Sequence, residues 1–140
     1  MISSSFFLLF RNIFFHNNIL KLGDFGVGVI IDNFKSTISI QSASSLAYMC
    51  PELFRDEPLT PKSDIWSAGV VIYEMAKLVK LFRFNVISEI MNFDVGTIHL
   101  EHVILQSLIK SMLKPKPSER MNSTELLYKL KVLIDLVETA

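Results

Sequence analysis

The sequence has little of what marks a secreted, membrane-spanning or nucleic-acid-binding protein. Its single cysteine, Cys50, cannot form a disulfide within the chain, so nothing indicates secretion. The apolar run at residues 6–10 is far shorter than the roughly 20 residues that cross a bilayer. The 14 basic and 14 acidic side chains balance, and no basic stripe points to nucleic acid. We therefore expect an intracellular, cytoplasmic protein with no membrane span and no nucleic-acid partner.

Apolar residues, by contrast, are abundant. Half of the 140 residues are hydrophobic, and phenylalanine alone accounts for 11 of them. A chain of this length forms one compact domain and is too short for two ordinary ones. Its mean hydropathy of +0.39 is high for a soluble domain, which predicts apolar surface that a partner covers.

The first part of the chain predicts a hairpin and then a loop. Two short apolar runs, residues 13–15 and 19–22, flank His16, Asn17 and Asn18. Because asparagine tolerates positive φ, this spacing predicts a β-hairpin with a tight turn. Residues 23–45 show no sustained helical period and predict a long loop.

The rest of the chain predicts helices. Ser63 and Asp64 offer N-cap side chains to a helix over residues 65–79, which is nearly free of charge and therefore expected to be buried. Apolar faces predict two shorter helices over residues 85–93 and 102–113.

A capping box predicts where the last helix begins. Asn122 and Glu125 have the residue types and the spacing of that motif. An apolar stripe with helical period follows, made of Leu126, Leu130, Leu133 and Val137.

Four segments carry a resemblance to a known family. In chain order they read Lys-Leu-Gly-Asp-Phe-Gly at residues 21–26, Tyr-Met-Cys-Pro-Glu at 48–52, Ser-Asp-Ile-Trp-Ser-Ala-Gly at 63–69 and Pro-Ser-Glu-Arg at 117–120. Together they resemble the eukaryotic protein kinase superfamily, Ser/Thr type, with Cys50 in place of the family's usual alanine. The finer group stays open, and the NIMA-related kinases are among those that the motifs resemble.

The resemblance implies the fold and the domain limits. We expect a mainly α structure like a kinase C-terminal lobe: a short β-hairpin and an activation segment packed on a helical bundle, with the small lobe absent. Residues 12–140 would be this partial kinase domain, and residues 1–11 an apolar leader of unassigned origin.

The resemblance also implies a site for ATP and Mg²⁺. Asp24 would hold Mg²⁺ bridging the ATP phosphates, since a hard cation takes carboxylate oxygen. Asn12 would supply the second metal ligand, because the predicted hairpin returns the chain between the two residues. Taken alone, Asn12 is equally typical of a turn or strand edge.

Other family positions are structural or contact the substrate. Glu52 and Arg120 would form a buried ion pair that fastens the activation segment to the helices. Asp64 has two compatible roles, capping its helix or holding the catalytic-loop backbone. A groove beside the substrate residue would be lined by Ser45, Leu46 and Tyr48.

Parts of the family's catalytic machinery have no counterpart in this sequence. Counting back from Asn12, the catalytic aspartate falls on Phe7, which cannot accept a proton. We find no Gly-rich loop, strand lysine or helix glutamate before it. The resemblance therefore implies ATP and Mg²⁺ for a complete member of the family, and we do not expect this chain alone to bind them well.

The predicted loop carries hydroxyl side chains where kinases place activating phosphates. A phosphate there orders the loop by pairing with arginine, and Phe6 stands at the position of one usual arginine partner. A plain polar loop is the alternative. The candidate phosphosites are Ser36, Thr37, Ser39 and Ser42.

Three hypotheses follow. The chain is part of a Ser/Thr protein kinase that is catalytically incompetent alone, or a pseudokinase-type scaffold that binds through its helical lobe, or a fragment without function. The expected partner is a protein substrate or a partner kinase.

Overall fold

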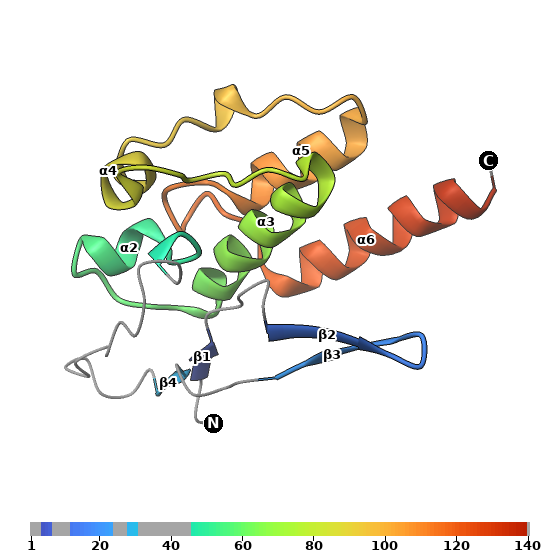
Figure 1. The fold of residues 1–140 in the computed structure, drawn as a ribbon, viewed down its shortest axis with the longest axis horizontal. Helices are drawn as coiled ribbons and strands as arrows, with labels where there is room; N and C mark the ends of the chain where they lie inside the picture. The colour runs from blue at the N-terminus through green and yellow to red at the C-terminus, as the bar shows by residue number, and fades with distance from the viewer. Residues whose placement is uncertain (1–3, 7–11, 24–27, 31–45, 140) are drawn as a thin grey trace.

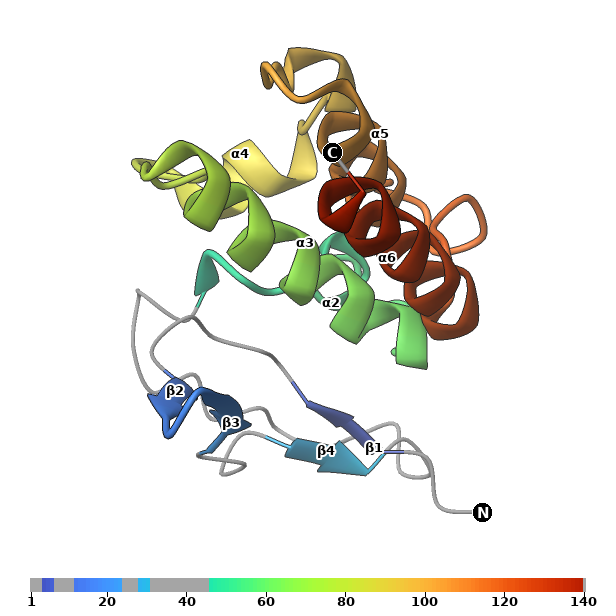
Figure 2. The ribbon, with the colours of Figure 1, turned by 90° about the vertical axis from the view of Figure 1, so that its right-hand side faces the viewer.

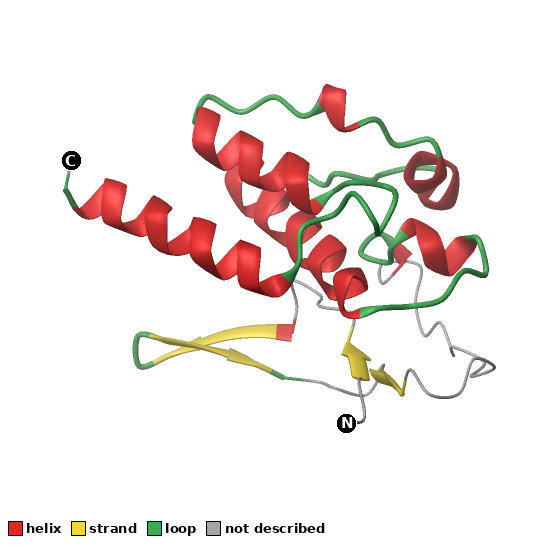
Figure 3. Ribbon diagram, turned by 180° about the vertical axis from the view of Figure 1, so that it is seen from behind, coloured by secondary structure: helices red, strands yellow, loops and turns green. Residues whose placement is uncertain are grey.

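The computed structural model describes residues 4–6, 12–23, 28–30 and 46–139. Strands and helices form separate layers: the strands lie together below a body of packed helices (Figures 1 and 2). The helical content dominates in the view coloured by secondary structure (Figure 3). The expected mainly α fold with a short hairpin is confirmed.

Strands β2, Ile13–His16, and β3, Ile19–Leu22, form the predicted antiparallel hairpin. Its two turn residues, Asn17 and Asn18, have φ of 50° and 59°, the left-handed conformation that a tight two-residue hairpin turn needs. A hydrogen bond from the Gly23 amide to the Asn12 carbonyl, 2.9 Å long, extends the pairing beyond the strands.

A second antiparallel pair joins distant parts of the chain. Strand β1, Ser4–Phe6, pairs with β4, Gly28–Ile30, across the whole hairpin. The first strand lies within the expected leader and the second within the expected loop, so both segments have regular structure that local pattern did not indicate.

Helix α3, Pro61–Lys77, begins earlier than predicted. Its N-cap is Thr60, not Ser63 or Asp64: the Thr60 side chain accepts a hydrogen bond from the Lys62 amide, and the Ser63 hydroxyl accepts one from the Thr60 amide. Proline at the first helical position costs nothing, because that amide has no partner within a helix. Asp64 therefore lies inside the first turn and is not the cap.

The remaining helices surround α3. Short α2 spans Pro51–Phe54, α4 spans Val86–Met91, a 3₁₀ turn η2 spans Val95–Thr97, and α5 spans Val103–Met112. Helices α4 and α5 lie within the two predicted ranges. No helix in the described part of the chain is long and apolar enough to cross a membrane.

The main core forms where α3 meets the loops and α5. Trp66 is fully buried and stacks on Phe82 at 6.2 Å, while Phe93 meets both rings edge-on. Gly69 lets α3 approach α5 closely: a Cβ there would lie 2.9 Å from Leu113 Cδ2 and 3.0 Å from Met112 Cβ. An added methyl group at Gly69 would therefore press on two fully buried side chains.

Helix α6, Ser123–Glu138, starts with the predicted Asn122–Glu125 capping box and then projects away from the body (Figure 1). The predicted stripe is only half-buried at Leu126, Leu130 and Leu133, and Val137 is exposed. Further apolar side chains are exposed on it: Leu127, Tyr128, Val132, Ile134 and Leu136.

Candidate functional site

A buried arginine joins α2, the start of α3 and the loop after α5 at the base of the helical body. The Arg120 guanidinium makes a two-pronged ion pair with Glu52, with Nη1–Oε1 at 2.7 Å and Nη2–Oε2 at 2.9 Å. Both side chains are fully buried. Arg120 also donates to the carbonyls of Lys62 at 2.8 Å and Lys114 at 3.0 Å, and its guanidinium lies over the Trp66 ring.

This arrangement satisfies both charges. Burial by itself raises the pKa of the Glu52 carboxyl, but the hydrogen bonds and charge of Arg120, helped by the Ser63 hydroxyl at 2.9 Å, outweigh it and lower the pKa. Glu52 therefore stays ionised. The pair brings three of the four motif segments together: residues 48–52, 63–69 and 117–120.

A second, partly buried network surrounds Tyr48. Its hydroxyl donates to Glu74 Oε2 at 2.7 Å and accepts from Lys80 Nζ at 3.0 Å, and the Lys80 ammonium lies 5.2 Å from the Tyr48 ring centroid. Burial, more than any other cause, raises the pKa of the Tyr48 phenol, so it stays neutral. The hydrogen bond to Tyr48 raises the pKa of Lys80, which keeps its charge.

The resemblance implied a place for Tyr48 in a substrate groove. Its hydrogen bonds with Glu74 and Lys80 were not predicted. Glu74 could have indicated such a network. It is one of two charged residues in the otherwise apolar part of α3, and a charged side chain on a buried helix is stable only with a polar or charged partner. Lys80 follows the helix end and carried no such signal.

The segment before α2 is fastened to α3. The buried Ser67 hydroxyl donates to the Tyr48 carbonyl at 2.8 Å. Leu46 is half-buried and packs on the main core. Burial raises the pKa of the Cys50 thiol to about 12, so it is protonated and behaves as a small apolar side chain.

The hairpin places Asn12 next to the residue that precedes Asp24. Asn12 is buried, and its carbonyl accepts the Gly23 amide. Asp24 itself lies outside the described residues. Amide and carboxylate oxygens suit Mg²⁺, so the donor chemistry of Asn12 and Asp24 fits the expected metal. Among the described residues, no three His, Cys, Asp or Glu side chains gather as a metal site.

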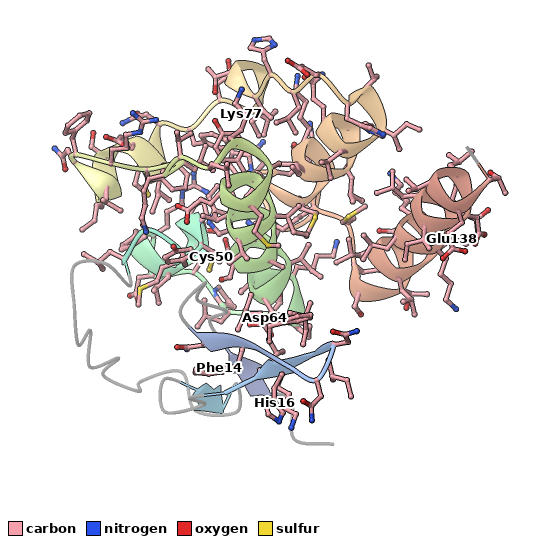
Figure 4. All side chains as sticks on the ribbon, turned by 45° about the vertical axis from the view of Figure 1, so that its right-hand side comes forward. Phe14, His16, Cys50, Asp64, Lys77 and Glu138 are labelled. Carbon is pink, nitrogen blue, oxygen red and sulfur yellow. The ribbon has the colours of Figure 1, made fainter. Side chains whose placement is uncertain are left out.

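Asp64 is half-buried and lies at the end of α3 that faces the hairpin, opposite Lys77 (Figure 4). The expected contact of Asp64 with the catalytic-loop backbone stays a prediction, because residues 7–11 lie outside the described residues. Several other predicted positions lie outside the described residues: Phe7, Ser36, Thr37, Ser39, Ser42 and Ser45.

Comparison with known proteins covers most of the chain. The model of the protein kinase domain matches residues 9–130. The Ser/Thr-protein kinase Nek3 of Oryza sativa subsp. japonica is 38% identical over 115 residues, 77% of this chain and 19% of that protein. Nek3 of Mus musculus is 36% identical over 123 residues, 84% of this chain and 24% of that protein.

Nek11 of Homo sapiens is 30% identical over 122 residues, again 84% of this chain and 19% of that protein. The chain thus spans about a fifth of the length of these relatives.

Proposed function

Because this chain belongs to the protein kinase family, we propose that it forms the helical lobe of a Ser/Thr protein kinase domain and does not transfer phosphate by itself. The observation that supports the helical-lobe assignment is the buried Glu52–Arg120 pair, which joins three motif segments at the base of the helical body. Such a base holds the end of the activation segment against α3, where a protein substrate would be aligned.

In the whole protein, Asn12 and Asp24 would hold Mg²⁺ on the ATP phosphates, where the cation neutralises developing charge. The hairpin supports this role, because the hydrogen bond from the Gly23 amide to the Asn12 carbonyl holds Asn12 beside the residue that precedes Asp24. The residues of this chain would then supply two Mg²⁺ ligands and would hold the surface on which the protein substrate is aligned.

Phe7 carries the second half of the proposal. It stands where the family has the aspartate that orients the substrate hydroxyl and takes its proton. A phenyl ring has no acceptor for that proton. Two metal ligands without a base and without a phosphate cover are insufficient for phosphoryl transfer, so these 140 residues are expected to be inactive alone.

A second candidate, a pseudokinase-type binding module, is favoured by one observation. Apolar side chains on the hairpin are exposed on both faces, among them Phe14, Phe15 and Leu20, and α6 exposes a further set. Monomeric proteins rarely leave so much apolar surface uncovered. A partner kinase or protein substrate in the cytoplasm would be the partner in either case.

The test is a phosphorylation assay on the purified chain, with labelled ATP, Mg²⁺ and a general protein substrate such as casein. We expect no transfer above a no-enzyme blank, and the same blank for Asp24→Ala. Transfer by the wild-type chain that Asp24→Ala abolishes would refute the proposed inactivity.

A thermal-shift measurement with ATP and Mg²⁺, repeated with EDTA, separates metal binding from catalysis. A Mg²⁺-dependent shift that Asp24→Ala and Asn12→Ala both remove supports the ligand roles. A shift that survives both substitutions contradicts them.

A further inference from the structure

Helix α6 carries a second apolar stripe besides the one that faces the helical body. Leu126 and Leu130 pack on a buried cluster to which α3 and α5 contribute. Three other apolar residues recur at every fourth position on a different side of the helix, about 140° away around its axis. They are Tyr128, Val132 and Leu136, and all three are exposed. We call these three residues the outer stripe.

The outer stripe lies mostly beyond the part of the helix that the family match includes. That match ends at residue 130, whereas α6 continues to Glu138 and projects away from the body (Figure 1). Rows of side chains with this spacing form the ridges that interdigitate when two helices cross. An exposed apolar row on a projecting helix is therefore a surface that fits another helix.

Two opposite charges lie along one side of the outer stripe. Lys131 and Asp135 are both exposed, and their side chains form no hydrogen bond or ion pair with any residue in the described part of the chain. They are four positions apart with the lysine first, which is the less favourable order for a pair within one helix. Both charges are available to a second molecule.

The stripe and the charges are self-complementary about one point. The stripe is centred on Val132, and the two charges are centred one residue farther along, a distance of about 1.5 Å. A two-fold axis perpendicular to α6 at this point places Val132 against itself and Tyr128 against Leu136 of a second copy. The same axis places Lys131 of each copy beside Asp135 of the other. One arrangement therefore satisfies the apolar and the charged contacts together.

The other exposed apolar pair of α6 has no such match. Leu127 and Ile134 are centred between residues 130 and 131, whereas the charges beside them, Lys131 and Glu138, are centred about 6 Å farther along the helix. A single two-fold axis cannot serve both sets.

A parallel pairing of the outer stripes is also disfavoured. It would bring Lys131 beside Lys129 of the second copy, and like charges at the edge of a helix pair repel each other. The charges thus specify the antiparallel orientation.

We propose that two copies of this chain associate through the outer stripes of α6 in an antiparallel, two-fold symmetric helix pair. Because α6 projects from its own body, this orientation puts the two bodies at opposite ends of the pair (Figure 1). One helix pair buries less surface than a standard interface, so the dimer is weak and forms only at micromolar concentrations or above. The inference goes beyond the proposed function and does not depend on it.

Sedimentation equilibrium of the purified chain, from low micromolar to near-millimolar concentration, tests the association itself. We expect a reversible equilibrium between monomer and dimer. A chain that stays monomeric throughout, or that forms only larger aggregates, would overturn the proposal.

Charge reversal tests the orientation of the pair. Lys131→Glu and Asp135→Lys each turn both ion pairs of the dimer into like-charge pairs, so each should raise the dissociation constant by roughly 10-fold. An equimolar mixture of the two variants should dimerise again, because the two new side chains then have opposite charges and the unchanged Asp135 meets the unchanged Lys131. Without that recovery the antiparallel arrangement is wrong.

Glu101→Lys is the matched control for Asp135→Lys. It reverses another exposed acidic side chain, in the loop before α5, and should leave the dissociation constant unchanged. If it weakened the dimer as much as Asp135→Lys does, net charge and not the contacts of α6 would govern association.

Leu136→Ser tests the apolar half of the contact, with Leu127→Ser as its control. Both leucines are exposed on α6, so the fold should persist in both variants, as thermal melts check. We expect Leu136→Ser to weaken the dimer at least ~10-fold and Leu127→Ser to leave it unchanged. Equal effects of the two would overturn the proposal. So would association that Phe15→Ser removes and Leu136→Ser does not, because the hairpin would then be the interface.

Discussion

The base around Arg120 and the outer layer of hairpin and α6 use their side chains in opposite ways. At the base, polar and charged groups are buried and joined: Arg120, Glu52 and Ser63 are all inaccessible to solvent. In the outer layer, apolar groups are exposed, with Phe15 on the hairpin and Val137 on α6 among the most open. The two regions meet through α3, whose first turn faces the strands.

The difference indicates which region is stabilised by contacts within the chain. Buried charges persist only where each has a partner, so the base depends on the long-range contacts that join Arg120 to Glu52 and Lys62. The outer layer gains less from its apolar side chains, because many of them, such as Phe15 and Val137, stay exposed to water while only part of α6 packs on the core through Leu126 and Leu130. Its energetics are expected to depend on what binds there.

The largest effect is expected from Arg120→Ala. Removing the guanidinium leaves Glu52 as a buried, unpaired charge and frees the carbonyls of Lys62 and Lys114. Breaking one half of such a pair costs about 3–5 kcal/mol. Chemical denaturation of the purified variant should show that loss in the free energy of unfolding.

Lys116→Ala is the matched control, since it also removes a cation. Lys116 pairs with Glu119 at 3.7 Å, but both side chains are largely exposed. Exposed pairs contribute about 0–1 kcal/mol, so this variant should stay close to wild type. If both variants lost the same free energy of unfolding, the buried pair would be no more important for stability than an exposed one.

Gly69→Ala tests the packing beneath the ion pair. The added Cβ would lie 2.9 Å from Leu113 Cδ2 and 3.0 Å from Met112 Cβ, and both neighbours are fully buried. Overpacking costs about 1–3 kcal/mol, from which alanine's better helix propensity recovers up to about 1. We expect a net loss of about 1–2 kcal/mol in the free energy of unfolding.

A double-mutant cycle identifies the cause of that loss. If the contact with Leu113 is responsible, Gly69→Ala with Leu113→Ala should cost less than the sum of the single changes. Strict additivity would show that the glycine serves some other purpose.

Acid should weaken the base selectively. The folded-state pKa of Glu52 is lowered, so its contribution is fully present above the unfolded pKa of about 4.3 and is lost as the pH falls through the folded pKa. One such group changes the free energy of unfolding by at most ~1.4 kcal/mol per pH unit. Denaturation of wild type between about pH 6 and 3 measures this slope.

Glu52→Gln supplies the comparison for the acid experiment. The variant is less stable at neutral pH, because the amide no longer neutralises Arg120. Below about pH 4.5, however, its stability should fall less steeply than that of wild type. Parallel slopes for the two proteins would show that other carboxylates cause the acid effect.

The sequence predicted those parts of the fold that local chemistry determines. Two adjacent asparagines determined the hairpin, and Asn122 with Glu125 determined the start of α6. The start of α3 was predicted wrongly: Ser63 and Asp64 were expected to cap the helix, whereas Thr60 is the cap and Pro61 is the first helical residue.

Some long-range contacts could be predicted from the family motifs, and others could not be predicted at all. Glu52 and Arg120 lie 68 positions apart, so their meeting was expected only from the resemblance. No such guide existed for Tyr48 with Lys80, or for β1 with β4, because pairing of distant segments depends on the packed tertiary structure. The positions of Phe7 and Asp24 stay predictions.

The smallest effect is expected in the outer layer, from Phe15→Ser. The Phe15 ring is 71% exposed, and its cross-strand partner in the hairpin is Leu20. Such a pair contributes about 0.2–1 kcal/mol, so the free energy of unfolding should fall by about 0.5 kcal/mol. Phe82→Ser, the same change at a buried ring, should cost several-fold more. If Phe15→Ser were as costly as Phe82→Ser, the hairpin would be part of the core and not a surface that depends on a partner.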